Sequence, residues 1–177
     1  FRQIPTFSRS TIRRFSANVS EQGKLAARDY EARLKCFIPP FEALLPRSDN
    51  KIVLDMVFDL AKWHALAKLR ANPEPTIRAL SETGTDVGKD LRLFSNKTCK
   101  NWVTLELRKE SAARGLRKAR TRTAGAALTR KIKSYSMTTY KFHSMPDFAP
   151  AIREFGSTDN FNTQTVSLSL AIFILTH

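Results

Sequence analysis

The stretch from Ser48 to Asn72, SDNKIVLDMVFDLAKWHALAKLRAN, decides the fold of this chain. Its apolar side chains go most of the way round a helical wheel, which predicts a core helix with neighbours on several sides. We expect Asp49 or Asn50 to cap the start of this helix. Asn72 and the prolines after it are expected to end the helix, because proline has no amide hydrogen and disfavours helical geometry in the residue before it.

The composition allows one ordinary domain, since 42% of the 177 residues are apolar. The 30 Lys and Arg residues against 16 Asp and Glu give a net charge of +14, which favours anionic partners such as nucleic acid or phospholipid surfaces. The two cysteines, Cys36 and Cys99, are far apart and have no further ligand at metal-binding spacing. Neither a disulfide scaffold nor a zinc site is therefore indicated.

The part before the core helix divides into a basic arm and a helix. Residues 1–20 contain several arginines, Arg13 and Arg14 among them, and no acidic residue. That composition fits a mitochondrial transit peptide, and it also fits an arm that lies on the domain or touches phosphate. A capping box at 18–21 and apolar residues at spacings of three and four then predict a helix that Pro39 and Pro40 end.

A further helix is expected after the core helix, with Thr76 as its cap. Apolar residues from Ile77 to Phe94 keep a three-four repeat that is typical of a packing seam. Gly84 in the middle of this repeat lowers helix propensity by about 1 kcal/mol, so we expect a kink or a close helix contact there. A seam this short favours packing within the chain over a dimer zipper.

Residues 105–134 change character, because ten basic residues between 105 and 133 stand against only Glu106 and Glu110. This segment is expected to form a solvated helix or a charged linker that buries little. Its cations can contact duplex phosphates, each contact releasing counterions. No aromatic residue is interleaved among them, so this segment gives no support for base stacking on single strands. The expected phosphate contacts are Arg13, Arg14, Arg114, Arg117, Lys118, Arg120, Arg122, Arg130, Lys131 and Lys133.

Residues 135–157 are expected to form a short helical pair that packs on the bundle. The polar run at 136–139 can cap the first of these helices. Phe155 is expected to pack inward, and Gly156 to end the second helix. Residues 158–177 are expected to form an unstructured or ill-packed tail, whose apolar end is too short to span a membrane because a spanning helix needs about twenty residues.

No catalytic motif stands out, since the sequence has no glycine-rich phosphate loop, nucleophile elbow or HExxH run. Asp55 and Asp59 lie one helical turn apart, with His64 following, and are the candidates for a metal site. They fit better the narrow polar face of a mostly buried helix. We therefore expect no enzyme activity, no cofactor and no small-molecule substrate for the chain as it stands.

Four blocks of the sequence, in their order and spacing, resemble the C-terminal part of the Plavaka-type transposases of mushroom-forming fungi, a branch of the CACTA group. The blocks are RQIPTFSRSTIRRF (2–15), KLAARDYEARLKCFIPPFEALLP (24–46), VLDMVFDLAKWHALAKLR (53–70) and YKFHSMPDFAPAIREFGSTDNFNTQT (140–165). The resemblance implies DNA as the partner and a nuclear location. For an intact transposase it also implies a carboxylate triad using Mg²⁺ or Mn²⁺ on an RNase H-like core, most of it upstream of this segment.

The chain departs from the family pattern after Thr165. It continues as Val166-Ser167 and an unrelated apolar string, where the family continues into a Gly-Glu-Leu-Glu-His-Arg run that contains a glutamate alignable with the last acidic catalytic residue. A fungal splice donor often reads GT, a purine and AGT, which encodes Val-Ser in this frame. We therefore interpret 166–177 as translated intron or as decay of an inactive element, and no catalytic residue carries over onto this chain.

These features predict an all-α chain, a small irregular bundle of about five to seven helices with a flexible basic segment and an ill-packed tail. The predicted parts are a basic arm over 1–20, a bundle over 21–104, a basic helix or linker over 105–134, a helical pair over 135–157 and a tail over 158–177. The predicted function is that of a transposon-derived fragment, inactive as a catalyst alone, that binds DNA non-specifically.

Two alternatives to this function stay open. One is a helical module that docks on a larger transposase, or on itself, through an exposed stripe at 77–94. The other is part of an active metal-dependent transposase, if the sequence is incomplete.

Overall fold

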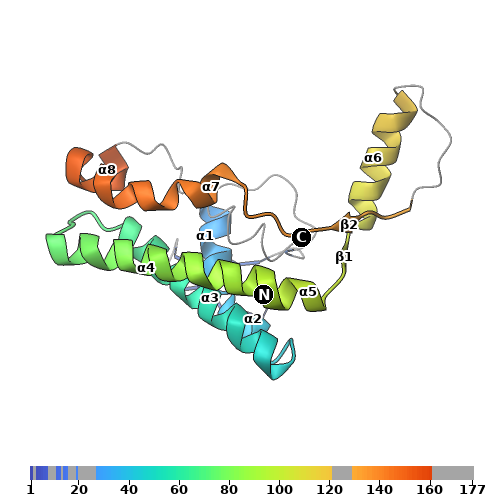
Figure 1. Ribbon diagram of the computed structural model, residues 1–177, viewed down its shortest axis with the longest axis horizontal. Helices are drawn as coiled ribbons and strands as arrows, with labels where there is room; N and C mark the ends of the chain where they lie inside the picture. The colour runs from blue at the N-terminus through green and yellow to red at the C-terminus, as the bar shows by residue number, and fades with distance from the viewer. Residues whose placement is uncertain are drawn as a thin grey trace.

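The computed structural model of this chain describes residues 1, 3–7, 11, 12, 14, 15, 19, 27–120 and 129–160, with the side chains of 27, 118–120 and 159 left out (Figure 1). In this part of the chain, five helices have eight or more residues. The order of the α-helices and strands is α1 (Ala27–Lys35), α2 (Ile38–Phe41), α3 (Arg47–Ala67), α4 (Glu74–Leu93), α5 (Cys99–Asn101), β1 (Thr104–Leu105), α6 (Arg108–Arg120), β2 (Ile132–Lys133), α7 (Tyr140–His143) and α8 (Phe148–Phe155). Shorter turns are η2 (Phe94–Thr98), η3 (Met145–Asp147) and η4 (Thr158–Asn160). The prediction of a small all-α fold is confirmed, with one two-residue strand pair added.

The antiparallel helices α3 and α4 lie side by side at the centre of the bundle, which comprises all the α-helices except α6 (Figure 1). The predicted core helix is buried on several sides, since Val53, Met56, Val57 and Trp63 are each at most 3% exposed. The predicted seam of α4 is buried as well, through Ile77, Leu80, Val87, Leu91 and Phe94. The stripe that the docking alternative would use is therefore packed within the chain.

Gly84 lies where α4 passes closest to Trp63 of α3. A β-carbon added at Gly84 would stand 3.1 Å from Nε1 of Trp63 and 3.4 Å from its Cδ1. The helix itself continues from Glu74 to Leu93 without interruption. Of the two outcomes predicted for Gly84, a kink or a close helix contact, the structure has the close contact, and the glycine lets the indole ring reach the backbone of α4.

Both ends of α3 differ from the prediction. The helix begins at Arg47 after Pro46, and no side chain caps it. Asp49 is not the cap, because it lies in the first turn and its carboxylate accepts hydrogen bonds from residues far along the chain. The helix ends at Ala67 instead of continuing to Asn72. The Ala67 carbonyl, one of the groups left unpaired at this end, accepts a 2.9 Å hydrogen bond from the hydroxyl of Thr158.

The prolines also shift two other boundaries. The first helix ends at Lys35, before Pro39 and Pro40, because neither proline can donate to the hydrogen-bond ladder of α1. Both prolines lie instead in α2, where the first turn needs no donors. Thr76 is not the cap of α4, which begins at Glu74 with Pro75 in its first turn.

Part of the N-terminal segment packs against α1 and the residue that follows it. Phe15 is 9% exposed, and it forms a small cluster with Phe1, Ile4, Ile12 and Val19 on one side and α1 on the other. This contact agrees with an N-terminal segment that lies on the domain, which was one of the two interpretations of residues 1–20. The capping box expected at 18–21 lies outside the described residues.

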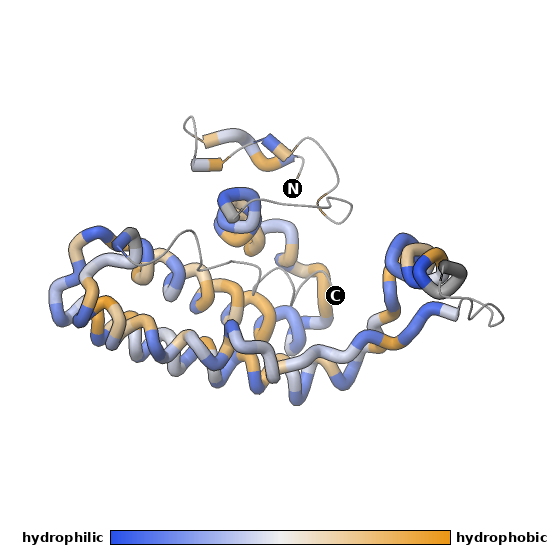
Figure 2. The backbone as a smooth tube through the Cα atoms, turned by 90° about the horizontal axis from the view of Figure 1, so that it is seen from above, coloured by the Kyte–Doolittle hydropathy of each residue, from blue (hydrophilic) through white to orange (hydrophobic). Residues whose placement is uncertain are grey.

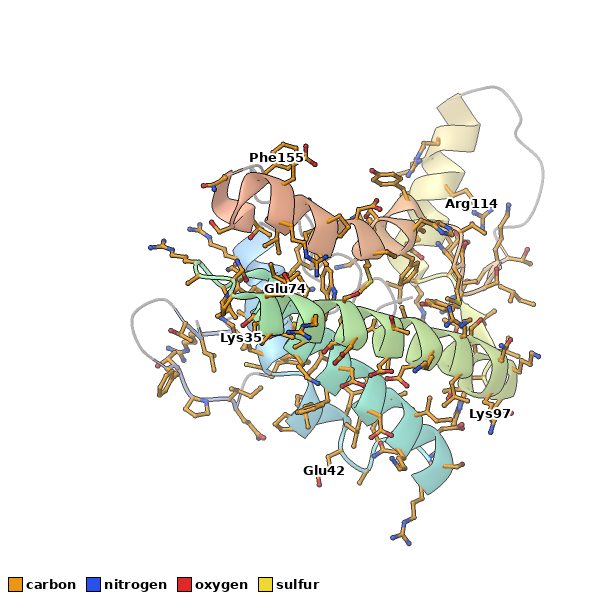
Figure 3. All side chains as sticks on the ribbon, turned by 60° about the vertical axis from the view of Figure 1, so that its left-hand side comes forward. Lys35, Glu42, Glu74, Lys97, Arg114 and Phe155 are labelled. Atoms are coloured by element: carbon orange, nitrogen blue, oxygen red, sulfur yellow. The ribbon has the colours of Figure 1, made fainter. Side chains whose placement is uncertain are left out.

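Of the C-terminal helices, α8 packs along α4 (Figure 1). Phe148 packs edge-on against Trp63, with ring centroids 5.1 Å apart, and Ile152 is 3% exposed. Phe155 does not pack inward, since it is 54% exposed and lies on the outer side of α8 (Figure 3). About one turn earlier in the helix, Ile152 already fills the inward position. Gly156 ends α8 with a φ of 83°, a left-handed conformation that favours glycine.

Candidate nucleic-acid interface

The basic segment forms an arm that stands clear of the bundle. We define the arm as residues 104–133, of which 104–120 and 129–133 are described. Its base is the antiparallel pair of β1 and β2, in which Thr104 faces Lys133 and Leu105 faces Ile132. Helix α6 rises from this base, away from the other helices, in both views (Figures 1 and 2). The separation follows from the sequence, because α6 carries few large apolar side chains with which to pack on the bundle.

Glu106 binds both α6, through Arg114, and the strand side of the arm, through Lys131. Its side chain is only 7% exposed and accepts two hydrogen bonds from Arg114, from Nε at 3.0 Å and from Nη2 at 2.7 Å. It also accepts the backbone N–H of Lys131 at 3.2 Å. The Arg114 guanidinium, and then the Lys131 amide, hold the pKa of Glu106 at about 2. Glu106 is therefore ionised at any physiological pH.

Contacts of Arg130 and Glu110 close the base of the arm. Arg130 donates from its guanidinium to the backbone carbonyls of Glu106 and Leu105. Glu110 accepts the backbone N–H of Leu107 at 3.0 Å, which is the return half of a capping box at the start of α6. Glu110 also lies 3.7 Å from the ammonium of Lys133. Both carboxylates of the arm thus act within the arm.

The predicted phosphate contacts consequently fall into three groups. Arg114 and Arg130 hold the arm together, and the half-buried Lys133 pairs with Glu110. Arg117 and Lys131 are exposed on the arm, and Arg14 is exposed on the N-terminal segment. The others lie outside the described side chains, and they are Arg13, Lys118, Arg120 and Arg122.

Arg108 and Lys109 are two exposed cations of the arm that sequence reasoning missed. They occupy the first turn of α6. The spacing of Leu107 and Glu110 is the signal that could have located this helix start. Cations in a first turn oppose the helix dipole by about 0.3–1 kcal/mol each. Their position is therefore not explained by helix stability.

The arm is joined to the bundle through Asp49 at the start of α3. Asp49 is 6% exposed. It accepts hydrogen bonds from the hydroxyl of Thr98 at 3.3 Å, from the amide of Asn101 at 3.4 Å and from the indole Nε1 of Trp102 at 3.1 Å. These three donors come from η2, α5 and the residue that follows α5, so one buried carboxylate fixes the point from which the chain enters β1.

The three candidate metal ligands of the core helix do not come together. Asp55 is exposed and pairs with Lys51. Asp59 faces Asp90 of α4, and burial, followed by this neighbouring carboxylate, raises the pKa of Asp90 to about 6. His64 is buried, and this burial lowers its pKa to about 4. No group of three or more His, Cys, Asp or Glu side chains among the described residues is arranged to hold a metal ion.

The described residues also show the state of the two cysteines and the apolar length of the helices. Cys36 is buried, Cys99 is half-buried, and both are free thiols. None of the helices in the described ranges is both long and apolar enough to cross a membrane.

Comparison with known proteins gave no match, whether with family models, with curated proteins or with solved structures. The resemblance of the four sequence blocks to Plavaka-type transposases accordingly stays a prediction.

Proposed function

We propose that this chain binds DNA without sequence preference through the arm, and that it has no catalytic activity of its own. The observation that carries the proposal is the distribution of charge on the arm. Both carboxylates are engaged inside the arm, Glu106 with Arg114 and Glu110 with the start of α6. The exposed cations Arg108, Lys109 and Lys131 are left to face the solvent.

The placement of these cations supports a role in binding. Two of them occupy the first turn of α6, where a positive charge opposes the helix dipole. An anionic ligand at that end of the helix would make the position of these cations favourable, because the first-turn amides and the cations would then both attract the ligand. A phosphate backbone is an extended anion of this kind.

The shape of the arm supports a backbone-directed mode. Helix α6 stands away from the bundle, so a duplex can approach it without meeting the other helices (Figure 2). Lysine and arginine contacts to phosphate fix position without reading sequence. The resemblance to DNA transposases, which implies DNA and a nuclear location, is consistent with the same proposal.

The experiment compares two triple variants that remove the same charge. The arm variant carries Arg108→Gln, Lys109→Gln and Lys131→Gln. The control variant carries Arg28→Gln, Lys62→Gln and Arg78→Gln, three exposed cations of the bundle. Binding to two unrelated 20-base-pair duplexes is measured by fluorescence anisotropy.

The proposal expects the arm variant to bind both duplexes at least tenfold more weakly than the control variant does. It also expects wild type to bind the two duplexes with the same affinity. Equal losses in the arm and control variants would contradict an arm-based interface, since they would assign binding to net charge alone.

A further inference from the structure

Trp102 is an exposed aromatic residue at the base of the arm. Its side chain is 47% exposed, whereas Trp63, the other tryptophan, is 3% exposed in the core. Trp102 lies between α5 and β1 in an extended conformation. Sequence reasoning found no aromatic residue within 105–133 and so gave no support for base stacking, but the structure places this one immediately before β1.

The ring of Trp102 is held in place although it is exposed. Its Nε1–H donates to the Asp49 carboxylate at 3.1 Å. Asp49 is itself fixed by Thr98, which is buried, and by Asn101. An indole held along its polar edge keeps its faces in one orientation, and a ligand that stacks on it therefore loses little additional side-chain entropy.

Two cations lie near Trp102 in the backbone: Lys100 of α5 and Lys133 of the arm, which also pairs with Glu110. Thr104 faces Lys133 across the strand pair, and Trp102 precedes Thr104 by two residues, which is about 7 Å of extended chain. Lys100 lies two residues before Trp102 and is exposed. An aromatic face beside cations is the arrangement by which proteins hold single strands, the base on the ring and the phosphate on the cation.

We propose that Trp102 stacks on an unpaired base, and that the arm therefore binds single-stranded DNA with Trp102 as an additional contact. This inference rests on the proposed function, because it takes the phosphate contacts from the same arm. It adds single-stranded DNA as a ligand class, which phosphate contacts alone do not distinguish from duplex DNA. A base inside a duplex is stacked on its neighbours and has no free face for the indole, so the contribution of Trp102 is specific for single strands.

The test measures binding of a labelled dT15 strand and of a 20-base-pair duplex to the full chain with Trp102→Ala or Trp102→Phe, at one salt concentration. Phenylalanine keeps an aromatic face but cannot donate to Asp49, so it separates stacking from anchoring. Circular dichroism confirms that each variant is folded. Tryptophan emission is recorded in the same titrations, because stacking on a base quenches indole fluorescence.

The proposal expects Trp102→Ala to weaken dT15 binding by about 5- to 150-fold, the range for loss of one stacked base, with less than a twofold change for the duplex. Trp102→Phe should keep most of the dT15 affinity, while the quenching by dT15 disappears. Equal weakening of dT15 and duplex binding by Trp102→Ala would overturn the inference, because Trp102 would then only position the arm. Unchanged binding of both would also overturn it and would leave the arm proposal intact. Absence of any DNA binding by wild type would overturn the proposed function itself.

Discussion

The contact between α3 and α4 predicts opposite outcomes for two glycines on the same helix. Gly84 and Gly88 both lie inside α4, one turn apart. In a helix interior, replacing glycine by alanine stabilises the folded state by about 0.5–1 kcal/mol when space allows. At Gly88 the added β-carbon would meet only the guanidinium of Arg92, at 3.5 Å, which is an ordinary contact with a flexible group. Gly88→Ala should therefore show the full gain.

At Gly84 the same change meets a fixed neighbour. The added β-carbon would stand 3.1 Å from Nε1 of Trp63, so the indole would have to move by a few tenths of an ångström. Trp63 is 3% exposed and packs edge-on against Phe148, which prevents an easy shift. Overpacking of this kind costs about 1–3 kcal/mol, more than the propensity gain. Gly84→Ala should therefore destabilise the fold by about 1 kcal/mol.

Urea denaturation of the two variants, followed by far-UV circular dichroism, measures this difference. The expected gap between them is about 1.5–2 kcal/mol in the free energy of unfolding, the sum of the opposite effects. The near-UV spectrum of Gly84→Ala should also change, because the indole moves, whereas that of Gly88→Ala should not. Equal stabilisation by the two alanines would refute the close contact of Gly84 with Trp63, and with it the packing of the central helix pair.

Three other changes test the buried polar groups of the bundle. Asp49→Ala should lower the free energy of unfolding by about 1–3 kcal/mol, because it removes the acceptor of several part-buried donors, whereas Asp55→Ala, at an exposed site, should have little effect in the same urea titration. The raised pKa of Asp90 means that its share of stability is fully present below pH 3.8 and is lost as the pH rises through about 6. Asp90→Asn should therefore stabilise the protein at pH 7.5 relative to wild type, by less than about 1 kcal/mol after solvent screening, and should give no gain at pH 3.5. Thermal melts at both pH values measure this difference. A gain that is equal at both pH values would count against the facing carboxylate of Asp59. The lowered pKa of His64 has the opposite sign, so its share of stability is present above pH 6.5 and is lost as the pH falls through about 4, and His64→Gln should remove a pH dependence of up to about 3 kcal/mol between those values. An unchanged pH profile in His64→Gln would show that another group titrates there.

The helix faces of the bundle were predictable because they follow from local spacing. The repeat from Ile77 to Phe94 predicted the buried seam of α4, and Gly84 predicted either a kink or a close helix contact, of which the close contact is present. Gly156 ends α8 as predicted. In each case the periodicity or the backbone conformation is a property of a few adjacent residues, so the sequence carries the signal directly.

The helix ends and the inner contacts of the arm were not predictable, because they depend on partners far along the chain. Aspartate is a common helix cap, but the carboxylate oxygens of Asp49 instead accept hydrogen bonds from Thr98 and Trp102, about fifty residues later. The carbonyl of Ala67, at the end of α3, has its hydrogen-bond donor in Thr158, which is 91 residues away. A charge count cannot separate Arg114, which is bound to Glu106, from cations that face the solvent. The two-residue strands of the arm are too short to leave a periodic pattern.

The salt dependence of duplex binding tests the central claim, that the exposed cations of the arm contact DNA phosphates. The logarithm of the binding constant is plotted against the logarithm of the salt concentration for wild type and for the triple variant of Arg108, Lys109 and Lys131. Each lost phosphate contact lowers the magnitude of the slope by about 0.9, so the account predicts a decrease of about 2.7 in the arm variant. The control variant of Arg28, Lys62 and Arg78 should keep the slope of wild type. Identical slopes for wild type and the arm variant would contradict the account.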